Sequence, residues 1–365
     1  MQTSREMAAW HGAARRVPPG AGAPSLSCLP TSRLVPVHLS DPSAPIFVAG
    51  HRGLVGSAVV RDLRAAGYGH LVLRTRAETD LRDRAAVDRL FAETEPAFVV
   101  VAAAKVGGIL ANATYPADFI ADNLAIAMNV IEAAHAAGVG RRGRLVFLGS
   151  SCIYPKHAPQ PMREEHLLTG PLEPTNRPYA IAKIAGLELA ESFHRQHGDD
   201  FVSLMPTNLY GDEDNFDLQT SHVLPALIRK FVEARGAAPD GSDAPVTLWG
   251  SGTPRREFLH ADDLAAAVRF TLEQPEDRLR TAAPDGVLNA GVGEDVTIAE
   301  LAEIVRDAVG SASEIVWDAS KPDGTPRKLL DVRRLAGLGW APSIALPEGV
   351  ARTVATFERL RAVAA

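Results

Sequence analysis

The sequence predicts an α/β fold in which a doubly wound parallel sheet carries helices on both faces. Short, continuously apolar runs, such as 46–49 and 97–104, alternate with longer stretches of helical period. Such runs are typical of strands that are buried on both sides. Glycines also stand directly between the first apolar run and the first helical stretch, where such folds make a tight turn. We therefore expect a Rossmann-like domain of about seven strands.

The elements are expected in a regular order. The strand 46–49 ends at Gly50, and a helical pattern then continues to Ala65. The next expected elements are a strand at 70–73, a helix at 84–95 and a strand within 97–104. They are followed by a helix near 117–137, a strand at 144–148, a helix at 179–197 and a strand at 201–205. The stretch 258–272 is expected to form a further helix of this domain.

Beyond Gly211 the regularity breaks, with shorter helical patterns and more Pro and Gly. We predict a Rossmann-like domain at 45–211 and 257–290, and a smaller C-terminal α+β domain at 212–256 and 291–365. The first 44 residues show scattered Pro, Gly and Ser without a sustained period, so we expect a disordered extension. Its four arginines allow a transit peptide as the alternative, but no amphipathic stripe supports one.

Composition excludes several classes of protein. The 365 residues hold 38 Lys and Arg against 44 Asp and Glu, a net charge of −6, which does not indicate binding to nucleic acid or to an anionic membrane. No run reaches the ~18 apolar residues of a membrane span. The two cysteines, Cys28 and Cys152, cannot form a disulfide framework, so we expect a cytoplasmic protein. We predict no metal site.

The first glycine loop has the spacing of a dinucleotide-binding turn. Gly50, Gly53 and Gly56 form GxxGxxG between a strand and a helix. Glycine allows the tight turn and a close approach of the backbone to a pyrophosphate, and the helix N-terminus favours the negative charge. The predicted cofactor-binding residues of this loop are Gly50, Arg52, Gly53, Leu54, Val55 and Gly56. The alternative is a structural turn.

The end of the second strand favours NADPH over NAD. An NAD-binding domain usually has Asp or Glu there to hold the ribose 2′-hydroxyl. This chain has Arg74 and Arg76, and no acid before Glu78. Arginine pairs well with a 2′-phosphate, and Arg52 could reach the same group. The alternative is that these arginines are solvated charges. Two further cofactor contacts are predicted near the adenine, at Asp80 and Leu81.

A serine, a tyrosine and a lysine form the predicted catalytic group. Tyr179 and Lys183 are four residues apart on one helix face, and we expect the ammonium to lower the pKa of the phenol. Ser150 follows the strand 144–148, and ligands of such sheets bind at the carboxyl ends of strands. Ser150 and Tyr179 can then bind the same substrate oxygen. The alternative for Tyr179 and Lys183 is a surface helical pair.

Together these motifs resemble the extended short-chain dehydrogenase/reductases and, among them, the GDP-L-fucose synthase family. The resemblance covers roughly residues 46–345. It is carried by AGHRGLVGSA (49–58), AAAKVGGI (102–109), GSSCIYPK (149–156), EPTNRPYAIAKIAG (173–186), PTNLYG (206–211), SHVLPAL (221–227), WGSGTPRREFLH (249–260) and GTPRKLLD (324–331). It implies an NADPH-dependent enzyme that epimerises C3 and C5 of GDP-4-keto-6-deoxy-D-mannose and reduces C4.

The resemblance also implies roles for single residues. Cys152 would be the base and His222 the acid of epimerisation, and Lys105 or Lys183 could favour the thiolate. Further cofactor contacts would come from Ala103, Lys183, Pro206, Asn208, Leu209 and His222. The sugar-nucleotide pocket would be lined by Lys230, Trp249, Arg256 and Asp323 or Lys328, with Asn123 as a weaker candidate. Each residue alone also fits a structural role: a buried thiol, a satisfied histidine or a core tryptophan.

The family pairs the helices near 117–137 and 179–197 across a dimer axis, so we expect a homodimer. The apolar stripes of these helices could equally bury against the sheet. Two other readings of the chain remain. A nucleotide-sugar 4-epimerase or 4,6-dehydratase would retain NAD, and would favour an acid at positions 74–76. A non-catalytic dinucleotide-binding module would tend to lose Tyr179 or Lys183.

Overall fold

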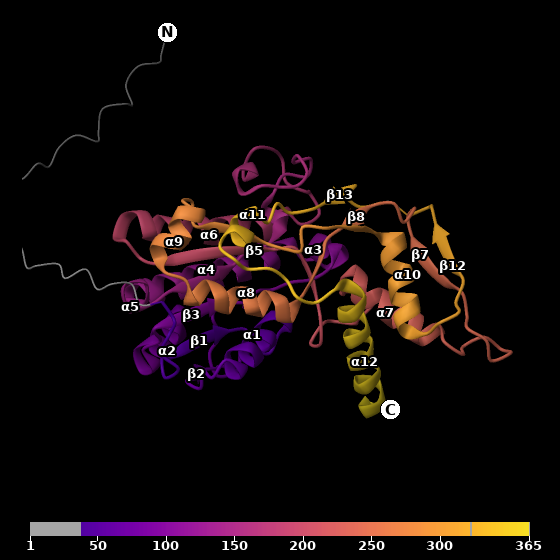
Figure 1. Ribbon diagram of the computed structural model, residues 1–365, viewed down its shortest axis with the longest axis horizontal. Helices are drawn as coiled ribbons and strands as arrows, with labels where there is room; N and C mark the ends of the chain where they lie inside the picture. Colours follow the sequence, from indigo (N-terminus) through magenta and orange to yellow (C-terminus); the bar gives the residue numbers. More distant parts are fainter. Residues whose placement is uncertain (1–37, 322, 365) are drawn as a thin grey trace, which may run out of the picture. The chain divides into compact units, whose positions relative to one another are not determined.

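The computed structural model describes residues 38–321 and 323–364 and contains a six-stranded parallel sheet (Figure 1). The strand order is β10-β5-β4-β3-β1-β2. The strands are β1 (Ile46–Ala49), β2 (Leu71–Val72), β3 (Phe98–Val101), β4 (Leu145–Leu148), β5 (Phe201–Pro206) and β10 (Val287–Ala290). The expected number of about seven is therefore one too high, and the order reverses at β1, as a doubly wound sheet requires.

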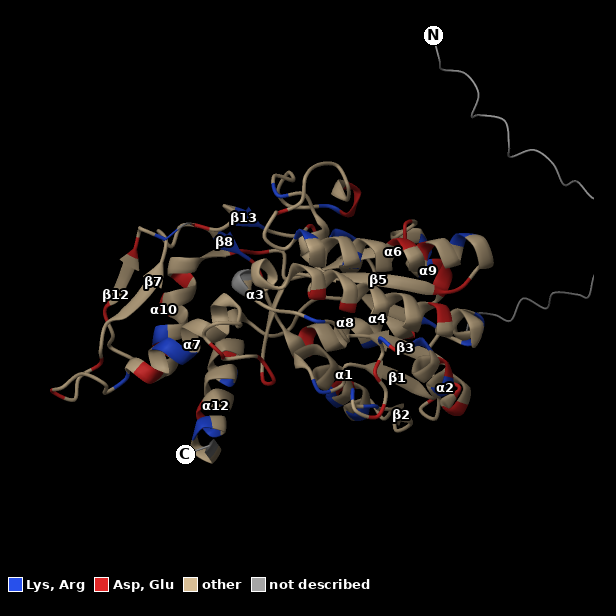
Figure 2. Cartoon of the chain, turned by 180° about the vertical axis from the view of Figure 1, so that it is seen from behind, with Lys and Arg blue, Asp and Glu red and all other residues tan. Residues whose placement is uncertain are grey.

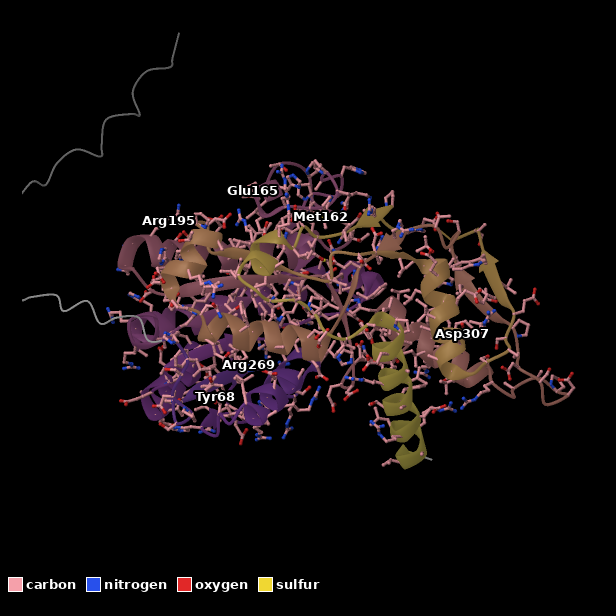
Figure 3. The ribbon with its side chains drawn as sticks, viewed as in Figure 1. Tyr68, Met162, Glu165, Arg195, Arg269 and Asp307 are labelled. Atoms are coloured by element: carbon pink, nitrogen blue, oxygen red, sulfur yellow. The ribbon has the colours of Figure 1, made fainter. Side chains whose placement is uncertain are left out.

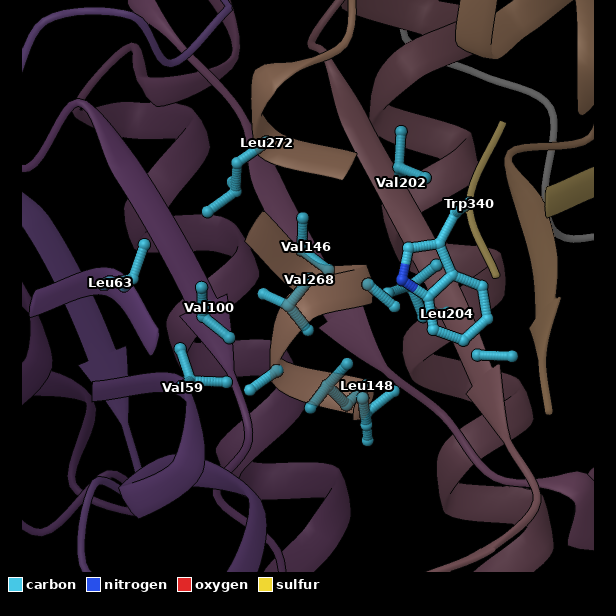
Figure 4. Packing of buried hydrophobic residues seen from close by; sticks show 14 of the residues in the cluster. Val59, Leu63, Val100, Val146, Leu148, Val202, Leu204, Val268, Leu272 and Trp340 are labelled. Carbon is cyan, nitrogen blue, oxygen red and sulfur yellow. The ribbon is translucent and has the colours of Figure 1, made fainter. Parts of the chain in front are cut away.

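Helices cover both faces of this sheet, as predicted. One layer contains α1 (Leu54–Ala65) and α8 (Ala261–Glu273), and the other contains α2 (Arg84–Thr94), α4 (Pro116–Ala136) and α6 (Arg177–His197). Alternate residues of β1 serve the two layers, since Val48 packs under α1 and α8 while Phe47 packs under α2 and α4. Figure 4 shows the first of these cores, with α1 and α8 packed on β3, β4 and β5.

The packed chain begins before residue 45. Most of the extension predicted at 1–44 lies outside the described residues, but Leu39 is buried and its N–H donates to the carbonyl of Leu272 at 2.8 Å. The Tyr68 hydroxyl bonds Glu273 at 2.9 Å, and the two labelled side chains Tyr68 and Arg269 lie on this side of the sheet in Figure 3. Residues 38–44 therefore belong to the folded part, not to a disordered extension.

The C-terminal segments form a second core. It is built by α7 (Val223–Ala234), β7 (Val246–Trp249), α10 (Ile298–Val309), β12 (Ile315–Asp318) and α12 (Leu346–Ala364). Beside it, β8 (Arg255–Arg256) pairs with β11 (Val296–Thr297) and β13 (Arg327–Lys328). The division into two domains stays a prediction. The remaining helices are α3 (Ile109–Thr114), α5 (Val139–Arg142), η1 (Ser151–Ile153), η2 (Glu164–His166), α9 (Glu276–Ala282) and α11 (Arg333–Gly337).

The helix expected at 258–272 starts three residues later than predicted. Its first residues form a strand, β9 (Phe258–His260), which pairs in parallel with β6 (Asn208–Tyr210). His260 then accepts a hydrogen bond at Nδ1 from the N–H of Asp262 and caps α8. The helical period could not reveal this strand, because Phe258 and Leu259 are apolar in either conformation. No helix within the described ranges has the length and apolar character of a membrane span.

Candidate active site

The glycine loop between β1 and α1 meets each requirement of a phosphate-binding turn. Gly50 has a φ of +83°, and a Cβ on it would lie 2.8 Å from the backbone of Ala103. A Cβ on Gly56 would lie 2.1 Å from the carbonyl oxygen of Gly50, so this glycine is required for helix and turn to pack. Gly53 differs, because a Cβ there would make only an ordinary contact at 3.6 Å. The protein itself therefore leaves open space over Gly53.

The helix behind this loop offers free donors. Gly53 is the N-cap of α1 and no side chain caps the helix, and its first turn holds no acid. The N–H groups of the first turn have no partner within a helix, and the helix dipole favours an anion in front of them. Leu54 and Val55 occupy this turn, and both are partly buried. The loop therefore fits a dinucleotide pyrophosphate.

Arginines gather at the end of β2. Glu78, the first acid after the strand, accepts hydrogen bonds from the N–H and the hydroxyl of Thr75 at 2.7 and 2.8 Å. These bonds lower the pKa of the Glu78 carboxyl, and Arg74 and Arg52 lower it further. Glu78 is thus tied into its own turn, and two guanidinium groups lie beside it. This arrangement suits a 2′-phosphate better than a free 2′-hydroxyl.

The candidates for the adenine side form an ionic cluster. Asp80 binds Arg82 at 2.7 Å, and its pKa is held well below the usual range by this side-chain hydrogen bond. Exposed Arg76 lies 3.6 Å from the same carboxylate, and Leu81 accepts a hydrogen bond from Asn129 through its carbonyl. Asp80 is therefore an anchor for Arg76 and Arg82.

The predicted catalytic side chains come together at the carboxyl end of β4. Lys183 is buried on α6, donates to the carbonyl of Leu148 at 2.7 Å, and has its Nζ 5.8 Å from the centre of the Tyr179 ring. Tyr179 and Ser150 interact through a hydrogen bond between their side chains. One helix and one strand end therefore place a phenol, a hydroxyl and an ammonium around one point.

The pKa of Tyr179 shifts in the direction opposite to our expectation. Burial raises the pKa of this phenol, and the nearby Cys152 raises it further, while the bond with Ser150 opposes the shift. Lys183 does not oppose this rise, because burial lowers the pKa of its ammonium to about 8, so the amine loses its charge before the phenol ionises. At neutral pH Tyr179 is therefore a proton donor.

Cys152 lies two residues beyond Ser150, and its sulfur is surrounded by donors. Asn176 Nδ2 lies 3.1 Å from Sγ and Lys328 Nζ lies 3.8 Å from it. Burial lowers the pKa of the Arg256 guanidinium, and interaction with Cys152 opposes that shift. Lys105, expected as a source of positive charge, instead pairs with Asp118 at 2.8 Å. The cations near the sulfur come from β8 and β13, which lie side by side in blue in Figure 2.

His222 stands at the N-terminus of α7. Its side chain is exposed, and partial desolvation by the surrounding protein lowers the pKa of its imidazole. The preceding residues are tied to the loop after β3, because the N–H of Gly108 donates to the carbonyl of Thr220 at 2.9 Å. Within the described ranges, no hydrogen bond joins His222 to Cys152 or Tyr179. The exposed His222 side chain is therefore free to exchange protons with a ligand or with water.

The substrate candidates are linked in a row. Lys230 donates to the carbonyl of Thr247, two residues before Trp249, whose side chain is 67% exposed. Asp323 accepts bonds from the N–H and hydroxyl of Ser251, and a Cβ on Gly324 would lie 2.9 Å from Arg256. The exposed Trp249 is not a core residue. The row ends at Arg256, beside Cys152.

The last cofactor candidates follow β3 and β5. Ala103 touches Gly50, and Pro206 pairs with the neighbouring β10 at Ala290. Asn208 donates to the carbonyl of Glu257 at 2.8 Å, and Leu209 packs into the core under α1. These residues lie where the chain leaves the carboxyl ends of the strands. Asn123 is buried and its amide exchanges hydrogen bonds with the backbone of Lys105, so it supports the loop after β3.

A family model described as "NAD dependent epimerase/dehydratase family" matches residues 46–291. The chain belongs to the NAD dependent epimerase/dehydratase family. Within the family it is 55% identical to GDP-L-fucose synthase of Escherichia coli K12 over 315 residues, which cover 86% of this chain and 96% of that protein. It is also 55% identical to GDP-L-fucose synthase 1 of Arabidopsis thaliana over 315 residues, 86% of this chain and 93% of that protein.

A solved structure is also similar to this chain in fold. A GDP-mannoheptose C4 reductase from Campylobacter jejuni with NADP bound superimposes with a TM-score of 0.78 and is 36% identical. The match covers 87% of this chain and 99% of that chain. The Rossmann-like fold expected from the sequence is thus confirmed.

Two further residues near the site, Asn176 and Glu257, were not predicted from the sequence. Asn176 lies in the segment that carries Tyr179, but nothing in its spacing indicated contact with Cys152. Glu257 is fully buried and accepts bonds from the N–H groups of Val292, Gly293 and Leu330. It holds three distant segments together directly behind Arg256. An acid between an arginine and two apolar residues could have signalled a buried carboxylate.

Proposed function

We propose that this protein converts GDP-4-keto-6-deoxy-D-mannose into GDP-L-fucose by epimerisation at C3 and C5 and NADPH-dependent reduction at C4. The observation that carries the proposal is the placement of Cys152 at the strand end that also carries Ser150, opposite Tyr179. A reductase alone needs the phenol and the hydroxyl. A thiol flanked by donors and cations at the same point adds a base for carbon acids.

Epimerisation uses the acidity of hydrogens next to the C4 ketone. The Cys152 sulfur removes the proton from C3 or C5, and the electron pair of the broken C–H bond moves to the C4 oxygen as an enolate. Ser150 and Tyr179 stabilise that oxygen by hydrogen bonds. His222 returns a proton to the opposite face of the carbon. Exchange of both groups with water then restores the thiolate and the imidazolium for the second carbon.

Reduction uses the same oxygen contacts. The glycine loop around Gly50, Gly53 and Gly56 would hold NADPH, which when bound would supply the hydride for C4. Tyr179, which burial keeps protonated, donates its proton to the C4 oxygen while Ser150 holds that oxygen in place. Lys183, fixed on the Leu148 carbonyl, positions the tyrosine ring, and its remaining N–H donors would hold the ribose hydroxyls of the cofactor.

Binding of the GDP-sugar needs local positive charge in an acidic chain. Lys230, Trp249, Arg256 and Asp323 form the proposed nucleotide and pyrophosphate contacts, with Lys328 at the sugar. Exposed Trp249 offers a stacking face for the base. In this assignment 45–211 and 257–290 bind the cofactor, and 212–256 and 291–365 bind the GDP-sugar.

We further propose a cytoplasmic homodimer. Helices α4 and α6 lie side by side, and exposed apolar side chains occur on both, at Met128 and Ile181. Residues of the two expected stripes, such as Val130 and Leu187, are buried in the chain's own core, so the contact would use these outward residues instead.

The proposal is tested by mixing the purified protein with GDP-4-keto-6-deoxy-D-mannose and either NADPH or NADH. NADPH should be oxidised with this substrate and much less NADH should be, because Arg52 and Arg74 suit a 2′-phosphate. Tyr179→Phe should lose the oxidation, and the unaltered protein with GDP-mannose should give none. Absence of NADPH oxidation at high protein concentration would refute the activity.

A further inference from the structure

The amide of Asn176 points at a sulfur instead of at its own helix. Asn176 is the N-cap residue of α6, three positions before Tyr179. Asparagine at this place normally accepts a hydrogen bond from the first turn of the helix. Here it makes no side-chain capping bond, and its Nδ2 donates to Cys152 Sγ at 3.1 Å.

The oxygen of the same amide is in an unfavourable environment. Asn176 Oδ1 is buried and has no hydrogen-bond partner among the described residues. One possible donor is missing because Pro178 occupies the second helical position and lacks an N–H. A buried acceptor without a partner destabilises the fold. Helix capping therefore does not account for this side chain.

Among the described residues, the recorded neighbours of the sulfur are donors or cations. Lys328 approaches from β13 at 3.8 Å, and Arg256 interacts with Cys152 from β8. Tyr179 is a further titratable neighbour, and its phenol stays protonated. Glu173, three residues before Asn176, is paired with Lys156 at 2.9 Å. The environment suits a sulfur that carries negative charge and accepts hydrogen bonds.

We propose that Asn176 is a positioning residue for the base: its amide N–H holds the Cys152 sulfur in place and stabilises it while it is negatively charged. The inference rests on the proposed function, in which Cys152 removes protons from C3 and C5. When the sulfur takes a proton it no longer needs the donor. The bond from Asn176 therefore favours the state of the cysteine that starts each epimerisation.

Asn176→Asp separates this role from capping. Aspartate caps helices as well as asparagine does, so a purely structural residue would tolerate the change. It has no N–H to donate, and its carboxylate would face the sulfur. We expect wash-in of solvent deuterium at C3 and C5, measured without cofactor, to fall by about tenfold to a hundredfold, the size of one hydrogen bond to a charged group.

The sulfur itself gives a second readout. In a Cys28→Ser background Cys152 is the single cysteine, so the rate of its alkylation by iodoacetamide can be followed against pH. Asn176→Asp and Asn176→Ala should both move this profile toward higher pH. Gln196→Ala, which removes an exposed amide from the far end of the same helix, should leave it unchanged.

The outcomes distinguish a failure of the role proposed for Asn176 from a failure of the proposed function. Exchange and alkylation profiles of Asn176→Asp that match the parent protein would overturn the role of Asn176 while leaving the activity intact. A parent protein that exchanges no deuterium would refute the proposed epimerisation. If Asn176→Ala does not fold, the aspartate variant, which keeps the size of the side chain, still decides the question.

Discussion

The side chains at the carboxyl end of β4 differ in how far their properties could be predicted. Ser150, Tyr179 and Lys183 were found because their grouping depends on local spacing, one strand end and one helical turn. The protonation state of Tyr179 was not predicted, because it depends on how deeply the phenol is buried, and residue spacing does not reveal burial. The approach of Lys328 to Cys152 joins residues far apart in the chain, which no single sequence predicts.

The role of Cys152 leads to a prediction for one substitution. Cys152→Ser should reduce deuterium exchange at C3 and C5 by a hundredfold or more, about the contribution of a general base. NADPH affinity, measured by fluorescence titration, should not change, because Cys152 lies after β4 and is not part of the glycine loop. Cys28→Ser is the control and should retain exchange. Full exchange in Cys152→Ser would assign the base to another residue.

Buried Lys183 should make stability depend on pH. Its pKa is lowered from 10.5 to about 8 in the folded protein by burial, so folding disfavours its charged form. Below pH 8 the charge is present in both states and destabilises the fold, and above pH 10.5 it is absent from both. The wild type should therefore gain stability relative to Lys183→Met between pH 8 and pH 10, by at most about 3 kcal/mol.

Urea unfolding of the two proteins at matched pH measures this difference. Other groups titrate equally in both, so the comparison isolates Lys183. A difference that stays constant or shrinks over this range would show that the ammonium is not desolvated in the folded state.

At the scale of elements, the turn between β1 and α1 was predicted together with its flanking strand and helix. The pattern could not tell which glycine serves packing and which serves a ligand. The structure separates them, because Gly56 is crowded by the Gly50 carbonyl and Gly53 is open. Strand β9 was missed for a different reason: its pairing with β6 depends on residues 50 positions away.

Substitution of the two glycines should therefore have different effects, one on cofactor binding and the other on stability. Gly53→Ala should leave the Tm almost unchanged and weaken NADPH binding about tenfold or more, because the new methyl group stands where the pyrophosphate approaches. Gly56→Ala should lower the free energy of unfolding by about 1–3 kcal/mol, the usual cost of overpacking. Thermal unfolding and NADPH titration of both variants give the answer. Unchanged NADPH affinity in Gly53→Ala would show that NADPH does not bind at this loop.

At the scale of the whole molecule, the Rossmann-like fold followed from the alternation of apolar runs and helical stretches, and the family comparison agrees with it. The loss of regularity after Gly211 led us to predict a smaller domain at 212–256 and 291–365, but not which elements would form the second core. Its elements come from separate stretches of the chain and assemble through long-range contacts such as β7 with β12. Glu257 joins three of these stretches behind the site, which local patterns cannot reveal.

The proposed dimer gives a prediction at this scale. Met128 and Ile181 are 48% and 41% exposed on neighbouring helices, an arrangement that exposes apolar surface in a monomer. The double substitution Met128→Glu with Ile181→Glu should convert a dimer into a folded monomer, seen by light scattering. Val316→Glu, an exposed apolar position on β12, is the matched control and should remain dimeric. An unaltered protein that is already monomeric contradicts the proposal.

The most direct test of the account is the product formed in D2O from GDP-4-keto-6-deoxy-D-mannose and NADPH. Base and reductase chemistry at one site predict GDP-L-fucose with deuterium at both C3 and C5, and one NADPH oxidised per sugar. NMR and mass spectrometry of the product measure both. A C4-reduced sugar that keeps its original configuration and hydrogens at C3 and C5 would show a reductase without epimerase activity and contradict the account.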